Sequence, residues 1–282
     1  MPSPGGIPPG ATRLTPQHLI AEAMQRHQSG DLDEAERLYR QALSLNPRDP
    51  DALHLLGLIL HQKEKNPAAL QLIEQAIAVD AGVASYHSNL GEVLRALGRS
   101  GDAIGAYRRA LNLRSNLVAA RYGLGIALIN EGTFSDAVVE FKSVLASDPH
   151  DWESHLNLGI ALSNLGHIEE GIAQFERVLG LKPGYPDAIR GLAKAFIGKG
   201  DYEEAAELLS GLSSSQPNDA DILLDLGFCF QELAQVERAI QVYRTALEIN
   251  PKLYGRVLVN LARASKGQFW LRPSAATKIL KT

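Results

Sequence analysis

A single spacing of 34 residues governs most of this 282-residue chain. Pro149, Pro183, Pro217 and Pro251 follow one another at this interval, and Pro47 precedes Pro149 by three intervals. A second series, consisting mostly of glycine, keeps the same interval: Gly57, Gly91, Gly125, Gly159, Ala193 and Gly227. Seven units of 34 residues therefore fit without insertion over residues 16–253. A fixed repeat of this length predicts a solenoid, in which each unit packs mainly against its neighbours.

Each unit has the pattern of two helices. When Pro16 is position 1 of the first unit, apolar residues recur at positions 4, 7 and 11, which is the spacing of one helix face. A glycine follows at position 15 in most units, where a helix end favours a left-handed residue. The second helix carries a small residue at position 20 and a large one at position 24, and the proline at position 32 ends it. Small residues at positions 8 and 20 predict a close approach of the two helices.

This pattern of small residues, a large residue and a closing proline resembles the tetratricopeptide repeat family. The resemblance covers nearly all of residues 16–253. It implies an all-α fold, a right-handed superhelix of seven helix-turn-helix repeats whose first helices line a concave groove. The chain departs from the pattern at position 15, where Glu64 and Ala234 replace the turn glycine.

The ends of the repeat array can also be assigned. We expect a disordered Pro/Gly-rich segment over 1–14, the repeats over 15–253, and a capping helix over 254–266, because the last repeat would otherwise expose its outer face. Residues 267–282 break the period and contain a run of large apolar side chains from Phe269 to Leu271. We expect this C-terminal tail to cover the end of the array, or to dock on a partner or a second copy, which would allow self-association.

Composition excludes several classes of protein. The formal net charge is −4 and the basic residues are spread along the chain, so nucleic-acid binding is not expected. Cys229 is the only cysteine, which excludes an intrachain disulfide and a cysteine-based zinc site. Its position 10 predicts a packed, structural thiol. No apolar stretch is long enough to span a membrane, and the first residues lack the pattern of a secretory signal. We therefore expect a cytoplasmic protein without membrane insertion.

No catalytic motif stands out in the sequence. The chain has no HExxH, no G-x-S-x-G and no phosphate-binding loop, so we expect no enzyme activity and no cofactor. His27, His54 and His61 could approach one another near the N-terminal end of the groove. We interpret them as solvated or ligand-facing side chains rather than metal ligands, and expect no metal site.

The groove should be lined by positions 2, 5, 6, 9, 12 and 13 of each first helix, since the other positions are used for packing. Apolar side chains at such positions are typical of a binding surface. Gly123 is expected to leave space there for a partner side chain. Carboxylates outnumber cations on these positions, which favours a peptide with apolar anchors and basic residues. The candidate binding residues are Asn89, Tyr122, Ile126, Asn157, Ile160, Leu224 and Phe228.

These features predict a non-catalytic scaffold or adaptor that binds an extended or helical peptide segment in its concave groove. The carboxylate clamp of chaperone-binding relatives is absent, because no three consecutive repeats supply its lysine, asparagine and arginine pattern. An alternative is a substrate-recruiting accessory arm of a separately encoded glycosyltransferase or sulfotransferase. The units resemble the repeat arms of O-linked N-acetylglucosamine transferases, where an asparagine ladder grips peptide backbones, and Asn89 and Asn157 occupy the ladder position. They also resemble the repeat arms of bacterial transferases.

Overall fold

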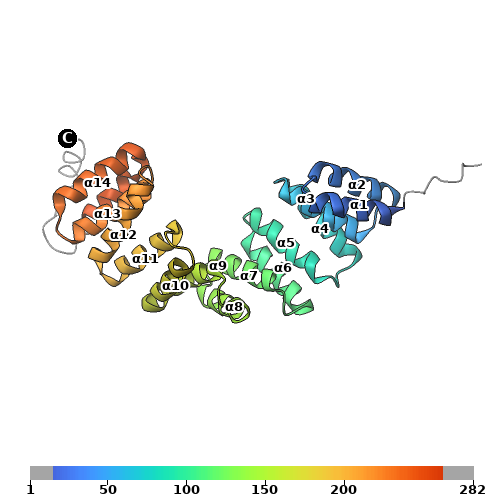
Figure 1. The fold of residues 1–282 in the computed structure, drawn as a ribbon, viewed down its shortest axis with the longest axis horizontal. Coiled ribbons are helices and arrows are strands. Elements are labelled where there is room, and N and C mark those ends of the chain that lie inside the picture. Colours follow the sequence, from blue (N-terminus) through green and yellow to red (C-terminus); the bar gives the residue numbers. More distant parts are fainter. Residues whose placement is uncertain (1–14, 263–282) are drawn as a thin grey trace, which may run out of the picture. The chain divides into compact units, whose positions relative to one another are not determined.

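The computed structural model describes residues 15–262, and within them the chain is helical, without a β-strand. It forms two compact units, residues 1–133 and 134–282 (Figure 1). The described part of the N-terminal unit contains α1 (Pro16–Gln28), α2 (Leu32–Leu45), α3 (Pro50–Gln62), α4 (Asn66–Val79), α5 (Ala84–Ala96), α6 (Ser100–Leu113) and α7 (Val118–Asn130). The described part of the C-terminal unit contains α8 (Phe134–Ser147), α9 (Trp152–Asn164), α10 (Ile168–Leu181), α11 (Pro186–Lys199), α12 (Tyr202–Ser215), α13 (Ala220–Glu232), α14 (Val236–Ile249), the 3-10 turn η1 (Pro251–Leu253) and α15 (Tyr254–Ala262).

The expected repeat is confirmed helix by helix. Every first helix begins at position 1 of its 34-residue unit, from Pro16 in α1 to Ala220 in α13. Every second helix runs from position 17 to position 30, so that it ends two residues before position 32. Five repeats have proline there, whose ring clashes with the preceding turn and which has no N–H to donate, but α4 and α6 end at the same position before Ala81 and Ser115.

The turn inside each repeat has one conformation throughout. Its position-15 residue has a positive φ whether it is glycine, as in Gly30 (83°), or not, as in Glu64 (59°) and Ala234 (58°). The following N–H donates to the carbonyl of position 11, for example from Lys65 to Leu60 at 2.8 Å. This is the Schellman geometry, which satisfies carbonyls left open at a helix end and requires the left-handed residue. Glu64 and Ala234 adopt it at a steric cost that glycine avoids.

In several repeats a large side chain at position 24 packs against glycine at position 8. Tyr107 and Tyr243, both at position 24, are fully buried. A Cβ added to Gly91 would lie 2.6 Å from Tyr107 Cε1, and one added to Gly227 would lie 2.5 Å from Tyr243 Cε1. Glycine therefore gives these two rings their space between the helices, whereas the first repeat buries Tyr39 with Ala23 at position 8.

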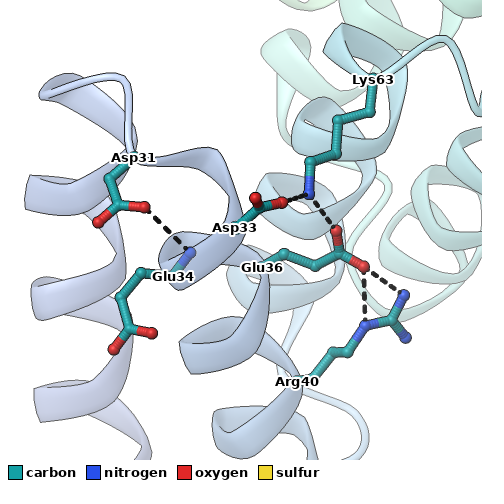
Figure 2. Close-up of polar contacts among 6 residues, drawn as sticks. All are labelled: Asp31, Asp33, Glu34, Glu36, Arg40 and Lys63. Carbon is teal, nitrogen blue, oxygen red and sulfur yellow. Dashed lines mark hydrogen bonds and ion pairs between the residues drawn. The ribbon is translucent and has the colours of Figure 1, made fainter.

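An ion-pair cluster joins the first two repeats (Figure 2). The Lys63 ammonium contacts Asp33 and lies 2.7 Å from Glu36 Oε2, and the Arg40 guanidinium lies 2.8 Å from Glu36 Oε1. Hydrogen bonds from Lys63 and Arg40 lower the pKa of Glu36. Because Lys63 directly precedes the left-handed Glu64, the cluster fixes this turn against helix α2 of the preceding repeat.

Helix α15 continues the array at its C-terminal side. The helix expected over 254–266 is described over Tyr254–Ala262, where Val257 and Leu261 are buried in the same core cluster as Tyr243. Its role as a cap remains a prediction. The N-terminal segment 1–14, residues 263–266 and the tail 267–282 lie outside the described residues. None of the helices within 15–262 is long and apolar enough to cross a membrane.

Candidate functional site

In the N-terminal unit, polar side chains of the first helices bond to one another across neighbouring repeats. The Asn89 amide nitrogen on α5 lies 2.8 Å from His54 Nε2 on α3. Burial lowers the pKa of His54 to about 4, so this imidazole is neutral at pH 7 and can accept the hydrogen bond. Tyr86 stacks on His54 with ring centroids 4.4 Å apart and donates to Asp51. The candidate residue Asn89 is thus held by its own chain.

A second paired group lies on α5. The Tyr107 hydroxyl donates to Glu92 Oε1 at 2.7 Å, and the Arg95 guanidinium donates to Glu92 Oε2 at 2.9 Å. Burial raises the pKa of Tyr107 well above its usual value, and its bond to Glu92 adds to the shift. Glu92 and Arg95, both at expected groove positions, therefore neutralise each other within one helix.

The prediction that Gly123 leaves space beside Tyr122 for a partner side chain is wrong. Gly123 is buried, and a Cβ added to it would lie 2.5 Å from Tyr107 Cζ of the preceding repeat. The ring fills the space that the missing side chain leaves, so no partner side chain can enter there. Tyr122 and Ile126 are themselves half-buried on α7.

The three histidines considered as a metal site do not converge. His27 Nε2 lies 3.0 Å from Gln62 Oε1, His61 Nδ1 lies 2.6 Å from Asn66 Oδ1, and His54 contacts Asn89. Among residues 15–262, no group of three or more histidine, cysteine, aspartate or glutamate side chains has a geometry that could hold a metal ion.

In the C-terminal unit, the candidates on α9 are partly used by the fold. The Asn157 side-chain amide donates to the Glu153 carbonyl of its own helix at 2.9 Å. Ile160 is half-buried and packs against a cluster that contains Phe175 and Leu192. Both side chains keep some exposed surface, but the Asn157 amide is hydrogen-bonded within its helix and Ile160 packs against neighbouring apolar side chains.

The candidates on α13 meet at a pocket. Helices α11, α12, α13 and α15 enclose a cavity of about 660 Å³ that both Leu224 and Phe228 line. Leu224 is only 2% exposed and forms part of the floor, whereas Phe228 is half-buried. The Tyr202 ring meets Phe228 edge-on with centroids 6.0 Å apart. Val259 of α15, which is 48% exposed, adds a further apolar side chain.

Charged side chains of both signs line the same pocket. Burial raises the pKa of Asp225, although the nearby cations Lys194 and Arg256 act to lower it. Glu232 is 2% exposed, so a second carboxylate lies deep in the wall. Burial thus disfavours the charged form of Asp225, and a ligand cation beside it would stabilise that form.

Cys229 lies beside this pocket but does not take part in it. The thiol is fully buried, and burial raises its pKa to about 12. A thiol in this state is neither a nucleophile nor a metal ligand at neutral pH, which agrees with the structural role expected from position 10.

The sequence pattern missed several residues that complete the pocket. Lys194 and Ile197 occupy expected groove positions 9 and 12 of the sixth repeat, and Val259 occupies position 6 when the register is extended into α15, so that signal was available. Tyr202 is different, because it is the first residue of a second helix, at a position that the groove pattern does not include. Only the packing of α12 on α13 brings it to the site.

Comparison with known families identifies the class. Sequence models of the tetratricopeptide repeat match residues 25–64, 63–118, 88–141, 122–186, 166–224 and 220–253, which together span 25–253. The chain belongs to the tetratricopeptide repeat family. No curated protein sequence matches it.

Solved structures share the fold at low sequence identity. YrrB, described as a tetratricopeptide protein with an unusual peptide-binding site, is 24% identical with a TM-score of 0.56, covering 61% of this chain and 89% of its own. PilW, a type IV pilus biogenesis factor, is 20% identical with a TM-score of 0.62, covering 72% and 94%. A tetratricopeptide repeat protein from Parabacteroides merdae is 19% identical with a TM-score of 0.64, covering 87% and 98%. At these identities the likeness establishes the fold alone.

Proposed function

We propose that this chain is a non-catalytic protein-interaction scaffold that binds a peptide segment of a partner on its first-helix surface. The observation that carries the proposal is the pocket of α11, α12, α13 and α15, where Phe228 and Leu224 lie beside Asp225 and Glu232. Its volume of about 660 Å³ is large enough to take up several side chains of a ligand. We name this cavity the concave pocket.

The lining of the concave pocket indicates the chemistry of the ligand. Phe228, Tyr202 and Val259 offer apolar contacts to an aromatic or aliphatic anchor. A lysine or arginine next to that anchor would face Asp225, and its charge would offset the desolvation that raises the pKa of this carboxyl. We therefore propose a segment with an apolar anchor followed or preceded by a basic residue.

The other candidate residues are proposed to make weaker contacts. Asn89, Asn157 and Ile160 are already engaged within the chain, and Tyr122 and Ile126 have no open space at Gly123. Binding energy at interfaces is concentrated in a few desolvated anchors surrounded by near-neutral contacts. The concave pocket should supply the anchor, and truncating any of these five residues should change the affinity less.

The test is peptide selection followed by calorimetry. Random 12-residue peptides displayed on phage would be selected against the whole chain, and the dissociation constants of the enriched peptides measured by titration calorimetry. Phe228→Ala should weaken binding by about 1–3 kcal/mol, roughly 5- to 150-fold, as for a hot-spot truncation. Tyr122→Ala should cost less than about 1 kcal/mol.

Val139→Ala is the matched control, because it truncates an apolar side chain that is 62% exposed on the second helix α8. It should leave the dissociation constant unchanged. If Phe228→Ala binds like the unaltered chain, or if Val139→Ala is the variant that loses binding, the concave pocket is not the binding site. Enriched peptides that lack lysine and arginine would contradict the part assigned to Asp225.

A further inference from the structure

The C-terminal unit carries a second pocket, on another face of α11. Ile189, Leu192 and Phe196 of α11 line a cavity of about 450 Å³ together with residues of α10 and α12. These three residues are spaced i, i+3 and i+7 and share one side of the helix, whereas Lys194 and Ile197, which line the concave pocket, project from another side. The two pockets are therefore separate sites.

The rim of this second pocket is acidic. Glu176 of α10 and Glu204 and Glu207 of α12 are exposed around an apolar floor completed by Leu208 and Leu212. No lysine or arginine is among the residues that line it. We name it the acidic pocket.

Gly211 keeps the acidic pocket open. A Cβ added at this position would meet no atom within 4 Å, so the space beside it is empty. The same position 26 is occupied by larger side chains in every other repeat: Gln41, Gln75, Arg109, Ser143, Arg177 and Thr245. The sixth repeat is thus the one in which this position carries no side chain.

One segment of the chain matches the acidic pocket in charge and in apolar content. Residues 263–282 contain five basic residues and no aspartate or glutamate, and Phe269, Trp270 and Leu271 follow one another in their middle. The concave pocket suits so many basic residues less, because Lys194 and Arg256 line it beside Asp225 and Glu232, whereas the acidic pocket carries carboxylates alone. Opposite charges around an apolar contact favour this pairing and disfavour the other.

The segment begins in the same unit as the acidic pocket. It follows α15, whose Val257 and Leu261 belong to the same hydrophobic cluster as Leu212, and Ile189, Phe196 and Leu208 pack against this cluster. Six residues lie between Ala262 and Phe269, and an extended chain from the first to the second of these spans roughly 25 Å. A 14-residue helix such as α12 is about 21 Å long, so the segment can cross a helix of the unit.

We propose that the acidic pocket binds residues 263–282 of the same molecule. The apolar run 269–271 enters between α10 and α12 beside Gly211, and the flanking lysine and arginine side chains face Glu176, Glu204 and Glu207. The proposal is independent of the proposed peptide binding at the concave pocket, since the two pockets lie on different faces of α11.

Trp270 provides the experiment, because Trp152 is the only other tryptophan of the chain. In the whole chain with Trp152→Phe, the emission of Trp270 should be shifted to shorter wavelength and shielded from acrylamide, compared with a synthetic peptide of residues 263–282. Gly211→Leu fills the pocket, and Glu204→Lys with Glu207→Lys reverses the charge of its rim. Each change should return the emission maximum and the quenching constant to those of the free peptide, with circular dichroism confirming that the helices are kept.

Glu248→Lys is the matched control, an exposed carboxylate of α14 that does not line either pocket. It should leave the Trp270 emission unchanged, and so should Phe228→Ala, which tests the concave pocket only. The proposal is overturned if Trp270 in the whole chain emits like the free peptide, or if Phe228→Ala releases it. It is also overturned if the blue shift grows with protein concentration alongside dimer formation in sedimentation, because the occupant would then be a second copy.

Discussion

The first-helix surfaces of the two units differ although they are built on the same repeat. At position 9 of the third repeat, Glu92 accepts a hydrogen bond from the buried Tyr107 of the same repeat. At position 9 of the seventh repeat stands Phe228, so the hydroxyl of the buried Tyr243 lies instead 3.3 Å from Gln231 Oε1. Phe228 is thereby left to face the concave pocket. At this variable position, one repeat therefore has a carboxylate that pairs with a buried tyrosine, and the other has an aromatic side chain that lines a cavity.

Position 6 shows the same contrast. Asn89 in the N-terminal unit bonds to His54 of the neighbouring first helix. Asp225 in the C-terminal unit is desolvated, with a raised pKa, and lines a cavity. Stability is served by satisfied polar groups, whereas binding requires groups that still gain from a partner. Under the proposed function, position 6 would therefore have a structural role in the third repeat and a binding role in the seventh.

We expect the greatest loss of stability when the buried ring of Tyr107 is removed, and a smaller loss when the ring of Phe228 is removed. Tyr107→Ala removes a fully buried ring that packs on Gly91 and Gly123, and should lower the free energy of unfolding by about 3–5 kcal/mol. Phe228→Ala removes a half-buried ring at the pocket and should cost less than about 1.5 kcal/mol. Urea unfolding followed by circular dichroism and fitted with a nearest-neighbour repeat model measures both. If both variants lowered the free energy of unfolding equally, Phe228 would contribute to stability as Tyr107 does, and the proposed difference between the two side chains would be wrong.

An intermediate effect tests what the units have in common. Glu64 in the N-terminal unit and Ala234 in the C-terminal unit are left-handed without being glycine. Glu64→Gly and Ala234→Gly should each raise the free energy of unfolding by about 1 kcal/mol, because glycine avoids the steric penalty of this conformation. Gly98→Ala, at a φ of 72°, is the reverse control and should lower it by a similar amount. A gain in one unit only would mean that the turns are not equivalent.

The smallest expected effect is an opposite response to pH. The pKa of Glu36 is lowered by Lys63 and Arg40, so its contribution to stability is present above the ordinary value of 4.5 and is lost as pH falls through the folded-state pKa. The pKa of Asp225 is raised by burial above its ordinary value of 3.8, so ionisation weakens the fold and stability rises as pH falls through the folded-state pKa. Each contribution should be about 1 kcal/mol or less.

Two amide variants separate these contributions. Glu36→Gln should lower the melting temperature at pH 7 and have less effect in acid, whereas Asp225→Asn should raise it at pH 7 and lose that advantage in acid. Differential scanning calorimetry between pH 3 and pH 7 gives both profiles, with Glu248→Gln as an exposed control. If both variants changed the melting temperature in the same direction at pH 7, Glu36 and Asp225 would not differ in their electrostatic contribution to stability.

The architecture of the repeats follows from local features of the sequence. The spacing of 34 residues placed the start of every first helix, and the glycine at position 15 marked the left-handed turn. These features are local, because proline, glycine and the apolar spacing act within one or two helical turns and need no information about a neighbouring repeat. The buried state of Cys229 and of the aromatic residues at position 24 followed from the same register.

The roles of the variable positions depend on packing between neighbouring helices, which the repeat pattern does not specify. The ring of Tyr107 of the preceding repeat fills the space beside Gly123, and the side chain of Leu224 is buried rather than exposed. Tyr202 reaches the concave pocket from a second helix. Each of these outcomes depends on which side chain of an adjacent helix projects into the space left by another. A periodic pattern assigns the same role to every equivalent position, but packing is settled by the particular volumes and polar groups that meet there.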